Sequence, residues 1–374
     1  MKIGIVTLPL HTNYGGILQA YALQMVLQRM GHDVEHLQPM NSLPRLHPMW
    51  KMPLVWCKRA FRKFFCGESK LPIFTDPRKW ITIHTDKFIR THINCRYINP
   101  SDWNENLARE YDAIVFGSDQ VWRLAYAVPI EKYFGFFIGD DDVKRLSYAA
   151  SFGTEENLFT PNQLQTCSSL LKKFNAVSVR EDSAVEMCKR LFDVDAQHHI
   201  DPTMLLSASD YVKLCKGKKL PKVDGYMAVY VLDENTQTDA FVEKLSRHKG
   251  LKPYRINSKV EDYSAPITER QQPPLEGWLK AFDEAEYIVT DSFHACVFSI
   301  LFNKPFVCLG NSFRGNARFN SLLSMFGLEN RMVDFNASLN EFLDLSIDWS
   351  RVNDILAEKR KEGKNFLDIF LVNV

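Results

Sequence analysis

Short apolar, β-branched runs alternate with helix-length amphipathic segments along most of the 374 residues of this chain. The first run, at 2–7, predicts a buried strand, and the segment 13–31 predicts a helix that ends at Gly31. Such alternation is typical of a mainly parallel sheet with helices on both faces, which is the α/β class. Further strands are expected at 34–37, 113–116, 146–150, 176–179, 198–200, 226–232, 253–256, 287–290 and 305–309, and further helices at 161–174, 182–192, 236–248, 275–284, 292–302 and 349–371.

The length of the chain favours two domains rather than one. The alternation pauses at Asp201-Pro202-Thr203, because a proline disfavours helix in the residue before it, and then starts again. We therefore expect two α/β domains with a boundary near 203–210, followed by a long C-terminal helix.

Charge and composition exclude several classes of protein. Lys and Arg number 46 and Asp and Glu 45, so no overall field favours nucleic acid. The longest apolar runs, 226–232 and 296–302, are too short to span a bilayer, and the run 3–8 is too short for a signal peptide. A cytoplasmic location is expected. The eight cysteines show no zinc-ligand spacing, so we interpret them as reduced thiols and expect no metal site.

The first candidate site is the loop His11-Thr12-Asn13-Tyr14-Gly15-Gly16, between the first strand and the first helix. Ligands bind at the carboxyl end of a parallel strand, against the free amides of the next helix. The loop is not a dinucleotide fingerprint, so NAD is disfavoured. The alternative is that the paired glycines only make a tight turn between strand and helix.

The second candidate, Ser118-Asp119-Gln120, follows the strand at 113–116. These side chains could bind a polyhydroxylated ligand, with Trp122 stacking against it. The alternative is that Ser118 or Asp119 caps the next helix.

The third candidate is Arg180, just past the strand at 176–179. Its planar fork suits a phosphate or carboxylate in the crevice beyond the strand. The alternative is a surface ion pair between Arg180 and Glu181.

The strongest candidate is Asp291-Ser292-Phe293-His294, at the end of the strand 287–290. Asp291 or Ser292 is expected to cap the following helix, and His294 falls in its first turn, where it could serve as a general acid facing a cleft. The alternative is a hydrogen-bonded core histidine. Downstream, Arg314 and Arg318 lie in and after a glycine-containing loop, the right neighbourhood for a phosphate clamp.

The segment 53–66 predicts a basic amphipathic helix. Its apolar face carries Leu54, Cys57, Phe61, Phe64 and Phe65, and its other face carries Arg59, Arg62 and Lys63. Such a helix could make peripheral contact with an anionic membrane surface, at the inner face of the membrane. The alternative is a helix packed on its own domain.

Seven motifs occur in the same order as in the polysaccharide pyruvyl transferase family, and the chain resembles that family over roughly residues 1–330. They are Asn13-Tyr14-Gly15-Gly16 with its flanks at 4–24, Phe116-Gly117-Ser118-Asp119-Gln120-Val121-Trp122, Ser147-Tyr148-Ala149-Ala150-Ser151-Phe152-Gly153, Ser178-Val179-Arg180-Glu181-Asp182, Asp201-Pro202-Thr203, Thr290-Asp291-Ser292-Phe293-His294 and Arg318-Phe319-Asn320-Ser321-Leu322-Leu323.

The resemblance implies two Rossmann-like domains facing across a cleft, as in the GT-B glycosyltransferases. The N-terminal domain, 1–203, would hold the acceptor, and the C-terminal domain, 204–348, the donor. The final helix, 349–374, could pack back on the N-terminal domain. Family members transfer pyruvate from phosphoenolpyruvate to sugar hydroxyls as a ketal, during synthesis of exopolysaccharide or capsule. No cofactor is implied beyond the donor substrate, and the acceptor sugar could be lipid-linked.

By the same resemblance, His294 and nearby arginines would bind the donor. The expected catalytic residues are His294 as the acid, Arg180, and Asp291, which like Asp119 could take the proton of a sugar hydroxyl. Ser292 stands where other members carry an arginine, so Ser292, Arg314 and Arg318 are the expected donor-binding residues. The expected acceptor-binding residues are Asn13, Tyr14, Gly15, Gly16, Ser118, Asp119 and Gln120. Two competing functions remain: a nucleotide-sugar glycosyltransferase of the same architecture, and a non-catalytic sugar-binding protein of a polysaccharide assembly complex.

Overall fold

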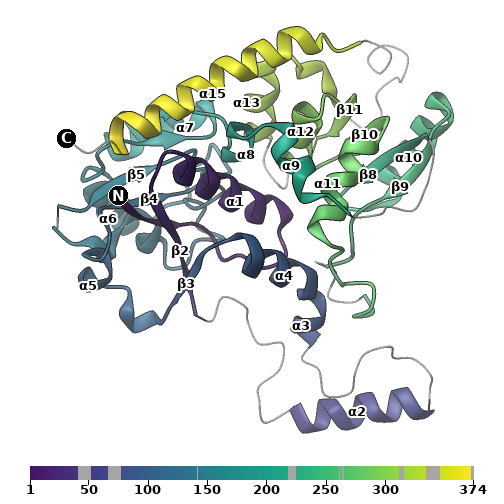
Figure 1. Ribbon diagram of the computed structural model, residues 1–374, viewed down its shortest axis with the longest axis horizontal. Coiled ribbons are helices and arrows are strands. Elements are labelled where there is room, and N and C mark those ends of the chain that lie inside the picture. Colours follow the sequence, from purple (N-terminus) through teal and green to yellow (C-terminus); the bar gives the residue numbers. More distant parts are fainter. Residues whose placement is uncertain are drawn as a thin grey trace.

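Two parallel sheets, each covered by helices, make up the body of the molecule (Figure 1). The computed structural model describes residues 1–40, 52–65, 77–140, 142–217, 225–260, 262, 265–310, 316–333 and 346–371. Within those ranges every helix is too short or too polar to cross a lipid bilayer. The cysteines there are all free, and Cys66 lies outside them.

The first sheet has the order β3-β2-β1-β4-β5, with every neighbouring pair parallel. Bridges such as Ala150 to Val179 continue it to a short parallel pair, β6 and β7. The strands are β1 (Lys2–Val6), β2 (Asp33–Pro39), β3 (Cys95–Ile98), β4 (Ala113–Phe116), β5 (Lys144–Ser147), β6 (Ser178–Val179) and β7 (Gln197–His198). Strand β4 is buried along its whole length and β1 along nearly all of it, which explains their uninterrupted apolar sequences.

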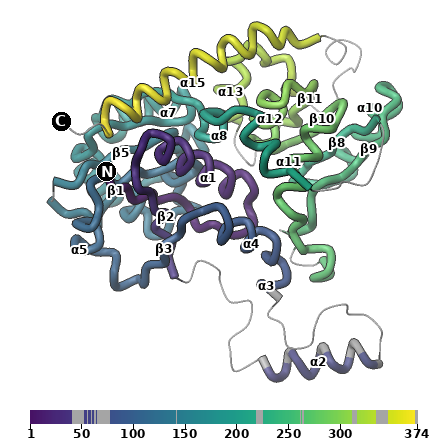
Figure 2. The backbone as a smooth tube through the Cα atoms, viewed as in Figure 1, coloured from purple at the N-terminus to yellow at the C-terminus, as the bar shows by residue number. Residues whose placement is uncertain are grey.

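The helices of this half lie on both faces of the first sheet. Side chains of α1, α4 and α8 join Ile3 and Ile5 in one core, and those of α5, α6 and α7 join Val6 and Phe116 in another. The helices are α1 (Tyr14–Arg29), α3 (Pro77–Ile81), α4 (Ile83–His92), α5 (Glu105–Ala108), α6 (Pro161–Leu171), α7 (Asp182–Met187) and α8 (Pro202–Leu205). The next helix, α9 (Ala208–Leu214), contacts α11 (Leu275–Glu284) of the second half. A further helix, α2 (Met52–Phe65), stands apart from both sheets (Figures 1 and 2).

The second sheet has the order β12-β11-β10-β8-β9 and is also parallel. Its strands are β8 (Tyr226–Tyr230), β9 (Lys252–Arg255), β10 (Tyr287–Thr290), β11 (Phe306–Leu309) and β12 (Met332–Val333). Its helices are α10 (Thr236–Lys249), α11 (Leu275–Glu284), α12 (Phe293–Leu301) and α13 (Ala317–Phe326). The core that contains α1 continues without a break into the face of this sheet covered by α11 and α12.

Strand order reverses once in each sheet, between β1 and β4 in the first and between β8 and β10 in the second. In open α/β sheets, ligands bind beyond the carboxyl ends of the strands at such a reversal. The segments that leave those ends are 7–16 and 117–120 in the first sheet, and 231–235 and 291–294 in the second. The candidate sites at Asn13–Gly16, Ser118–Gln120 and Asp291–His294 therefore lie at the two reversal points.

The C-terminal helix α15 (Trp349–Leu371) runs along both halves (Figure 1). It contacts α13 of the second half and α8 of the first. Its Arg360 donates hydrogen bonds to the carbonyl oxygens of Met204 and Leu206, at 2.6 and 2.7 Å, and its Phe366 ring lies 4.7 Å from that of His199. This helix therefore fastens the two halves to each other.

Gly363 of α15 offers a stability test, because a methyl group there would lie 2.4 Å from the hydroxyl oxygen of the buried Tyr148. Alanine favours a helix by about 1 kcal/mol over glycine, whereas overpacking costs about 1–3 kcal/mol. We expect Gly363→Ala to lower the free energy of unfolding in urea despite its better helix propensity. In a Tyr148→Phe background the same change should become neutral or stabilising. An equal loss in both backgrounds would contradict this explanation.

The observed elements agree closely with the expected strands and helices. The strands 113–116 and 287–290 and the helices 275–284 and 349–371 have their predicted bounds. The helix expected at 182–192 is divided, because α7 ends at Met187 and a π-helical segment, Cys188–Phe192, follows it. The sequence did not predict strands β3 and β12 or helices α3, α4, α5, α8, α9 and α13.

Candidate active site

The two reversal points meet where the α1 residue Gly15 touches His294 of α12. A Cβ atom at Gly15 would lie 2.0 Å from His294 Nδ1, so only glycine allows the ring to rest there. Gly15 and Gly16 both lie inside α1, with negative φ values, so neither serves the tight turn proposed as the alternative. His294 is buried, which corrects the expectation that it faces an open cleft.

Asp201 is the buried carboxylate that joins the two halves at this point. Its Oδ2 atom accepts hydrogen bonds from Arg180 at 2.8 Å and from the Ser118 hydroxyl at 3.2 Å, and lies 3.5 Å from His294 Nε2. Its Oδ1 atom accepts from the amide and hydroxyl of Thr203 and so caps α8. Burial alone would raise the pKa of Asp201, but His294, Arg180 and Thr203 hold that pKa well below its usual range. Asp201 is therefore a fixed negative charge, and His294 and Arg180 converge on it.

Arg180 is buried among carboxylates and does not face an open crevice. Besides Asp201, its guanidinium lies 3.6 Å from Asp119 and 3.5 Å from Glu181, and it stacks 4.4 Å from the centre of the Phe293 ring. Burial opposes its charge, yet the three carboxylates raise the pKa of Arg180 above its ordinary value. The alternative of an Arg180–Glu181 surface pair is also wrong, since both side chains are buried.

Arg318, in the first turn of α13, is the second buried guanidinium at this site. It lies 5.9 Å from the centre of the same Phe293 ring that Arg180 covers. Burial, and then the positive charge of Arg180, lower the pKa of Arg318 to about 10. An anion bound beside Arg318 would relieve both effects.

Ser118 and Asp119 lie at the carboxyl end of β4, beside these charges. Asp119 has φ 71°, a left-handed conformation that aspartate tolerates, and its Oδ2 atom would lie 3.4 Å from a methyl group at Gly16. No helix follows them in 121–129, a stretch that is fully described, so the alternative of a helix cap is wrong.

Gln120 and Trp122 have side-chain partners of their own. The Gln120 carbonyl accepts a hydrogen bond of 2.6 Å from Arg123. The buried Trp122 ring stacks on Phe134 at 5.2 Å and donates its N–H to the carbonyl of Tyr133. The prediction that Trp122 stacks on a ligand is therefore wrong.

Asn13 and Tyr14 have structural contacts of their own. Asn13 caps α1 by accepting a hydrogen bond from the amide of Gly16. Tyr14 is buried, donates its hydroxyl to the carbonyl of Pro273 at 2.5 Å, and packs 5.6 Å from the Trp278 ring. Tyr14 therefore holds the two halves together and cannot contact an acceptor in this arrangement, which corrects its expected place.

Asp291 and Ser292 make contacts that differ from those expected. Both oxygens of Asp291 accept backbone hydrogen bonds, from Leu232 at 2.7 Å and Asp233 at 2.9 Å, so its carboxylate holds the segment after β8. Ser292 occupies the N-cap position of α12, but among the described residues no side-chain hydrogen bond caps that helix. Neither residue caps it as expected, and Arg314 lies outside the described residues.

Sequence reasoning gave no role to Asp201 or Glu181, although both lie in the quoted motifs. Asp201 follows β7, which pairs with β6, so its place at the same sheet edge as Arg180 could have identified it. Glu181 accepts a hydrogen bond of 2.6 Å from Ser151, and burial raises its pKa above the ordinary value. The cluster is formed by segments that are far apart in the sequence, so no local sequence pattern indicates it.

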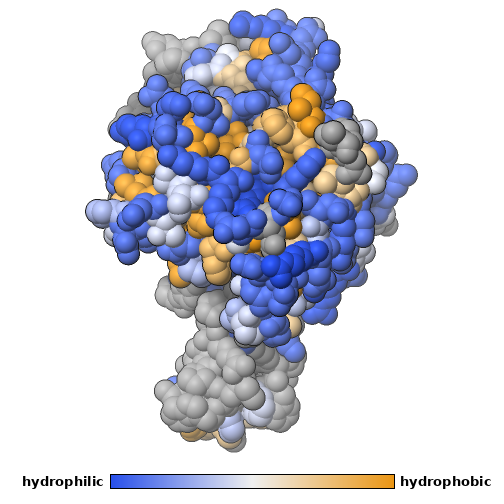
Figure 3. All heavy atoms as spheres, turned by 90° about the vertical axis from the view of Figure 1, so that its left-hand side faces the viewer, coloured by the Kyte–Doolittle hydropathy of each residue, from blue (hydrophilic) through white to orange (hydrophobic). Residues whose placement is uncertain are grey.

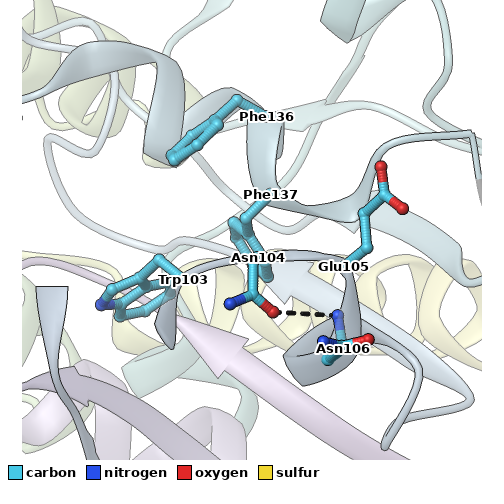
Figure 4. A pocket seen from close by; sticks show the side chains of 6 residues that line it. All are labelled: Trp103, Asn104, Glu105, Asn106, Phe136 and Phe137. Carbon is cyan, nitrogen blue, oxygen red and sulfur yellow. Dashed lines mark hydrogen bonds between the residues drawn. The ribbon is translucent and has the colours of Figure 1, made fainter. Parts of the chain in front are cut away.

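A cavity of about 490 Å³ lies elsewhere, beside α5 (Figure 4). Figure 4 shows Trp103 and Asn104 on one side and Phe136 on the other. Its one ionisable side chain, Glu105, forms an exposed ion pair with Arg109. Figure 1 places α5 on the opposite side of the first half from α12, so this cavity is separate from the His294 cluster.

Comparisons with known proteins identify both the family and the fold. A family model described as polysaccharide pyruvyl transferase matches residues 13–312. The crystal structure of a glycosyltransferase from Rickettsia africae ESF-5 is similar with a TM-score of 0.54 and 10% identity, covering 100% of this chain and 99% of that one. This likeness confirms the expected α/β fold of two Rossmann-like domains of the GT-B kind.

Two further matches are weaker. The UDP-GlcNAc 2-epimerase of Methanocaldococcus jannaschii, in complex with UDP-GlcNAc and UDP, has a TM-score of 0.48 and 12% identity, covering 99% of each chain. The ADP-heptose lipopolysaccharide heptosyltransferase II of E. coli has a TM-score of 0.37 and 12% identity, covering 97% of this chain and 99% of that one. No curated protein sequence matches the chain significantly.

Proposed function

The chain belongs to the polysaccharide pyruvyl transferase family, and we propose that it transfers a pyruvyl group from phosphoenolpyruvate to two hydroxyls of a sugar. The product would be a ketal on a cell-surface polysaccharide or its lipid-linked precursor. The observation that carries the proposal is the buried cluster of His294, Asp201, Arg180 and Arg318 at the meeting point of the two reversal points. It combines a group that can donate a proton with cations that can hold an anionic donor.

Arg318 is the better of the two described arginines for binding the donor phosphate. Asp201, Glu181 and Asp119 raise the pKa of Arg180 above its ordinary value. For Arg318, burial and the charge of Arg180 outweigh Glu181 and Asp119 and lower the pKa to about 10. Phosphate or carboxylate oxygens can take two parallel hydrogen bonds from a guanidinium. The amides at the start of α12, next to Ser292, would supply further donors.

Asp201 would position His294. The carboxylate lies 3.5 Å from His294 Nε2 and is itself fixed by Arg180 and Thr203. His294 Nδ1 faces Gly15, so a donor reaches the ring only when the two domains separate there or the ring turns.

The reaction balances with residues of this cluster. His294 would donate a proton to the methylene carbon of phosphoenolpyruvate while the first sugar hydroxyl adds to the neighbouring carbon and loses its proton to Asp119. The bond from that carbon to the phosphate oxygen would then break, and the second hydroxyl would take the place of the phosphate and lose its proton in turn. Arg318 would stabilise the charge of the departing phosphate. Asp291 is a poorer base, because both its oxygens accept backbone hydrogen bonds.

The test is acceptor-dependent release of inorganic phosphate from phosphoenolpyruvate, with soluble and lipid-linked sugar diols as acceptors. We expect phosphate release together with an acceptor whose mass has increased by one pyruvate less one water. Calorimetry with phosphoenolpyruvate and with a panel of nucleotide sugars provides the comparison. Binding of a nucleotide sugar without phosphoenolpyruvate would favour the glycosyltransferase, and binding of sugar alone would favour a non-catalytic protein.

A further inference from the structure

Helix α2 exposes large apolar side chains to a degree that is unusual in this molecule. Leu54 is 68% exposed, Phe61 59% and Phe64 72%. The three residues follow one another at intervals of seven and three, so they lie on one side of the helix, and the exposed Cys57 lies on the same side. Figures 1 and 2 both show α2 away from the two sheets.

Exposed apolar residues are distributed differently on the rest of the surface. Figure 3 shows one side of the molecule covered mostly by polar side chains, with hydrophobic residues in small separate groups. Outside α2, strongly exposed apolar residues are scattered singly, for example Val128 at 75% and Ile369 at 70%. Single exposed apolar residues need no explanation, whereas a row of them on one helix marks an interaction surface.

The sequence of α2 indicates which surface would cover that row. Its fourteen residues contain Lys58, Arg59, Arg62 and Lys63 and no acidic residue. Lys58 is exposed beside the apolar row. A helix that combines Leu and Phe with several cations and no carboxylate suits the boundary between anionic headgroups and acyl chains.

The place of α2 in the chain relates this surface to the cluster around His294. The chain leaves the first sheet at Pro39, the carboxyl end of β2, and β2 is parallel to its neighbour β1. It returns at α3, whose Trp80 and Ile81 carbonyls accept hydrogen bonds from Gln271 and Gln272 of the second half. Helix α2 thus belongs to the segment that connects two parts of the molecule. The segment starts at the edge of the first sheet that carries Asn13–Gly16, and it ends at α3, where the two halves meet.

We propose that α2 lies in the surface of an anionic lipid bilayer, with Leu54, Phe61 and Phe64 among the acyl chains and Lys58 at the headgroups. This inference does not depend on the proposed pyruvyl transfer activity. If the proposed function is also correct, docking through α2 brings the carboxyl edge of the first sheet to the surface that holds a lipid-linked acceptor.

The experiment is flotation of the full chain with vesicles of phosphatidylcholine, alone or with a third of phosphatidylglycerol. We expect binding to the anionic vesicles at low salt and release at high salt, because salt screens the attraction. Changing Lys58, Arg59, Arg62 and Lys63 to Gln should lower the partition coefficient at low salt by about two to three orders of magnitude. Leu54→Ala, Phe61→Ala and Phe64→Ala together should abolish stable binding.

The matched control is Val128→Ala with Ile369→Ala, which removes exposed apolar side chains of the body and should leave binding unchanged. Equal binding to neutral and anionic vesicles, no binding at all, or full binding by either α2 variant would overturn the proposal. So would sedimentation showing a dimer that the Leu54/Phe61/Phe64 variant disrupts, since a second copy would then cover the row. Phosphate release with a soluble acceptor should be equal in all variants, so failure of either proposal is seen independently of the other.

Discussion

Replacing His294 with glutamine should lower the turnover of phosphoenolpyruvate by about 10²–10⁴-fold, the usual contribution of general acid–base catalysis. Glutamine keeps part of the size and the hydrogen-bonding capacity of histidine but cannot act as an acid. The side chain is buried, so we also expect the free energy of unfolding to fall by about 1–2 kcal/mol. Asp201 keeps Arg180, Ser118 and Thr203 as partners, which limits that loss. Turnover should therefore change far more than stability.

His36 provides a matched control for this variant. It is a fully buried histidine in β2 whose Nε2 atom lies 3.1 Å from the carbonyl oxygen of Ala20, and burial lowers its pKa to about 4. His36→Gln should lower the melting temperature and leave the turnover of the folded fraction near normal. Melting temperature and phosphate release are measured on the same preparation of each variant. If His294→Gln behaved like His36→Gln, His294 would be a core histidine and its assigned role would fail.

The fold could be predicted largely because a strand that is buried on both faces of a sheet has a short run of apolar residues, which is easy to identify in a sequence. The run at 113–116 is apolar throughout and the run at 287–290 is apolar except for its final Thr290, and each is followed by polar or glycine residues. β3 was missed because Cys95–Ile98 is a short edge strand that includes an arginine and an exposed tyrosine. β12 was missed because two residues carry no periodicity.

The candidate site could be predicted only in part, since its chemistry depends on contacts between distant segments. The sequence places His294 in the first turn of a helix, but it does not indicate that the ring lies on Gly15. Arg180 is predicted at the end of a strand, whereas the carboxylates that balance it come from residues 119 and 201 as well as from its neighbour. Tyr14 looked like a ligand contact because its partners, Pro273 and Trp278, belong to the other half.

The contact between Gly15 and His294 gives the second large effect, and the chain supplies its own control in the adjacent glycine. A methyl group at Gly15 would overlap His294 Nδ1 at 2.0 Å, whereas one at Gly16 would meet its nearest atoms, in Asn13 and Asp119, at an ordinary 3.4 Å. Both glycines lie in the first turn of α1 with negative φ values, so alanine costs no backbone strain at either position. The two variants therefore differ mainly in whether the new methyl group displaces the imidazole ring of His294.

We expect Gly15→Ala to reduce turnover by about 10²-fold, because a displacement of about 1 Å at a reacting group can cost that much. Gly16→Ala should stay within a few-fold of the wild type. If the loss acts through His294, the double variant Gly15→Ala with His294→Gln should be no slower than His294→Gln alone, since coupled residues are not additive. Phosphate release measured for all four proteins decides this. A Gly15→Ala protein with normal turnover, or losses that multiply in the double variant, would show that the position of this ring does not limit the reaction.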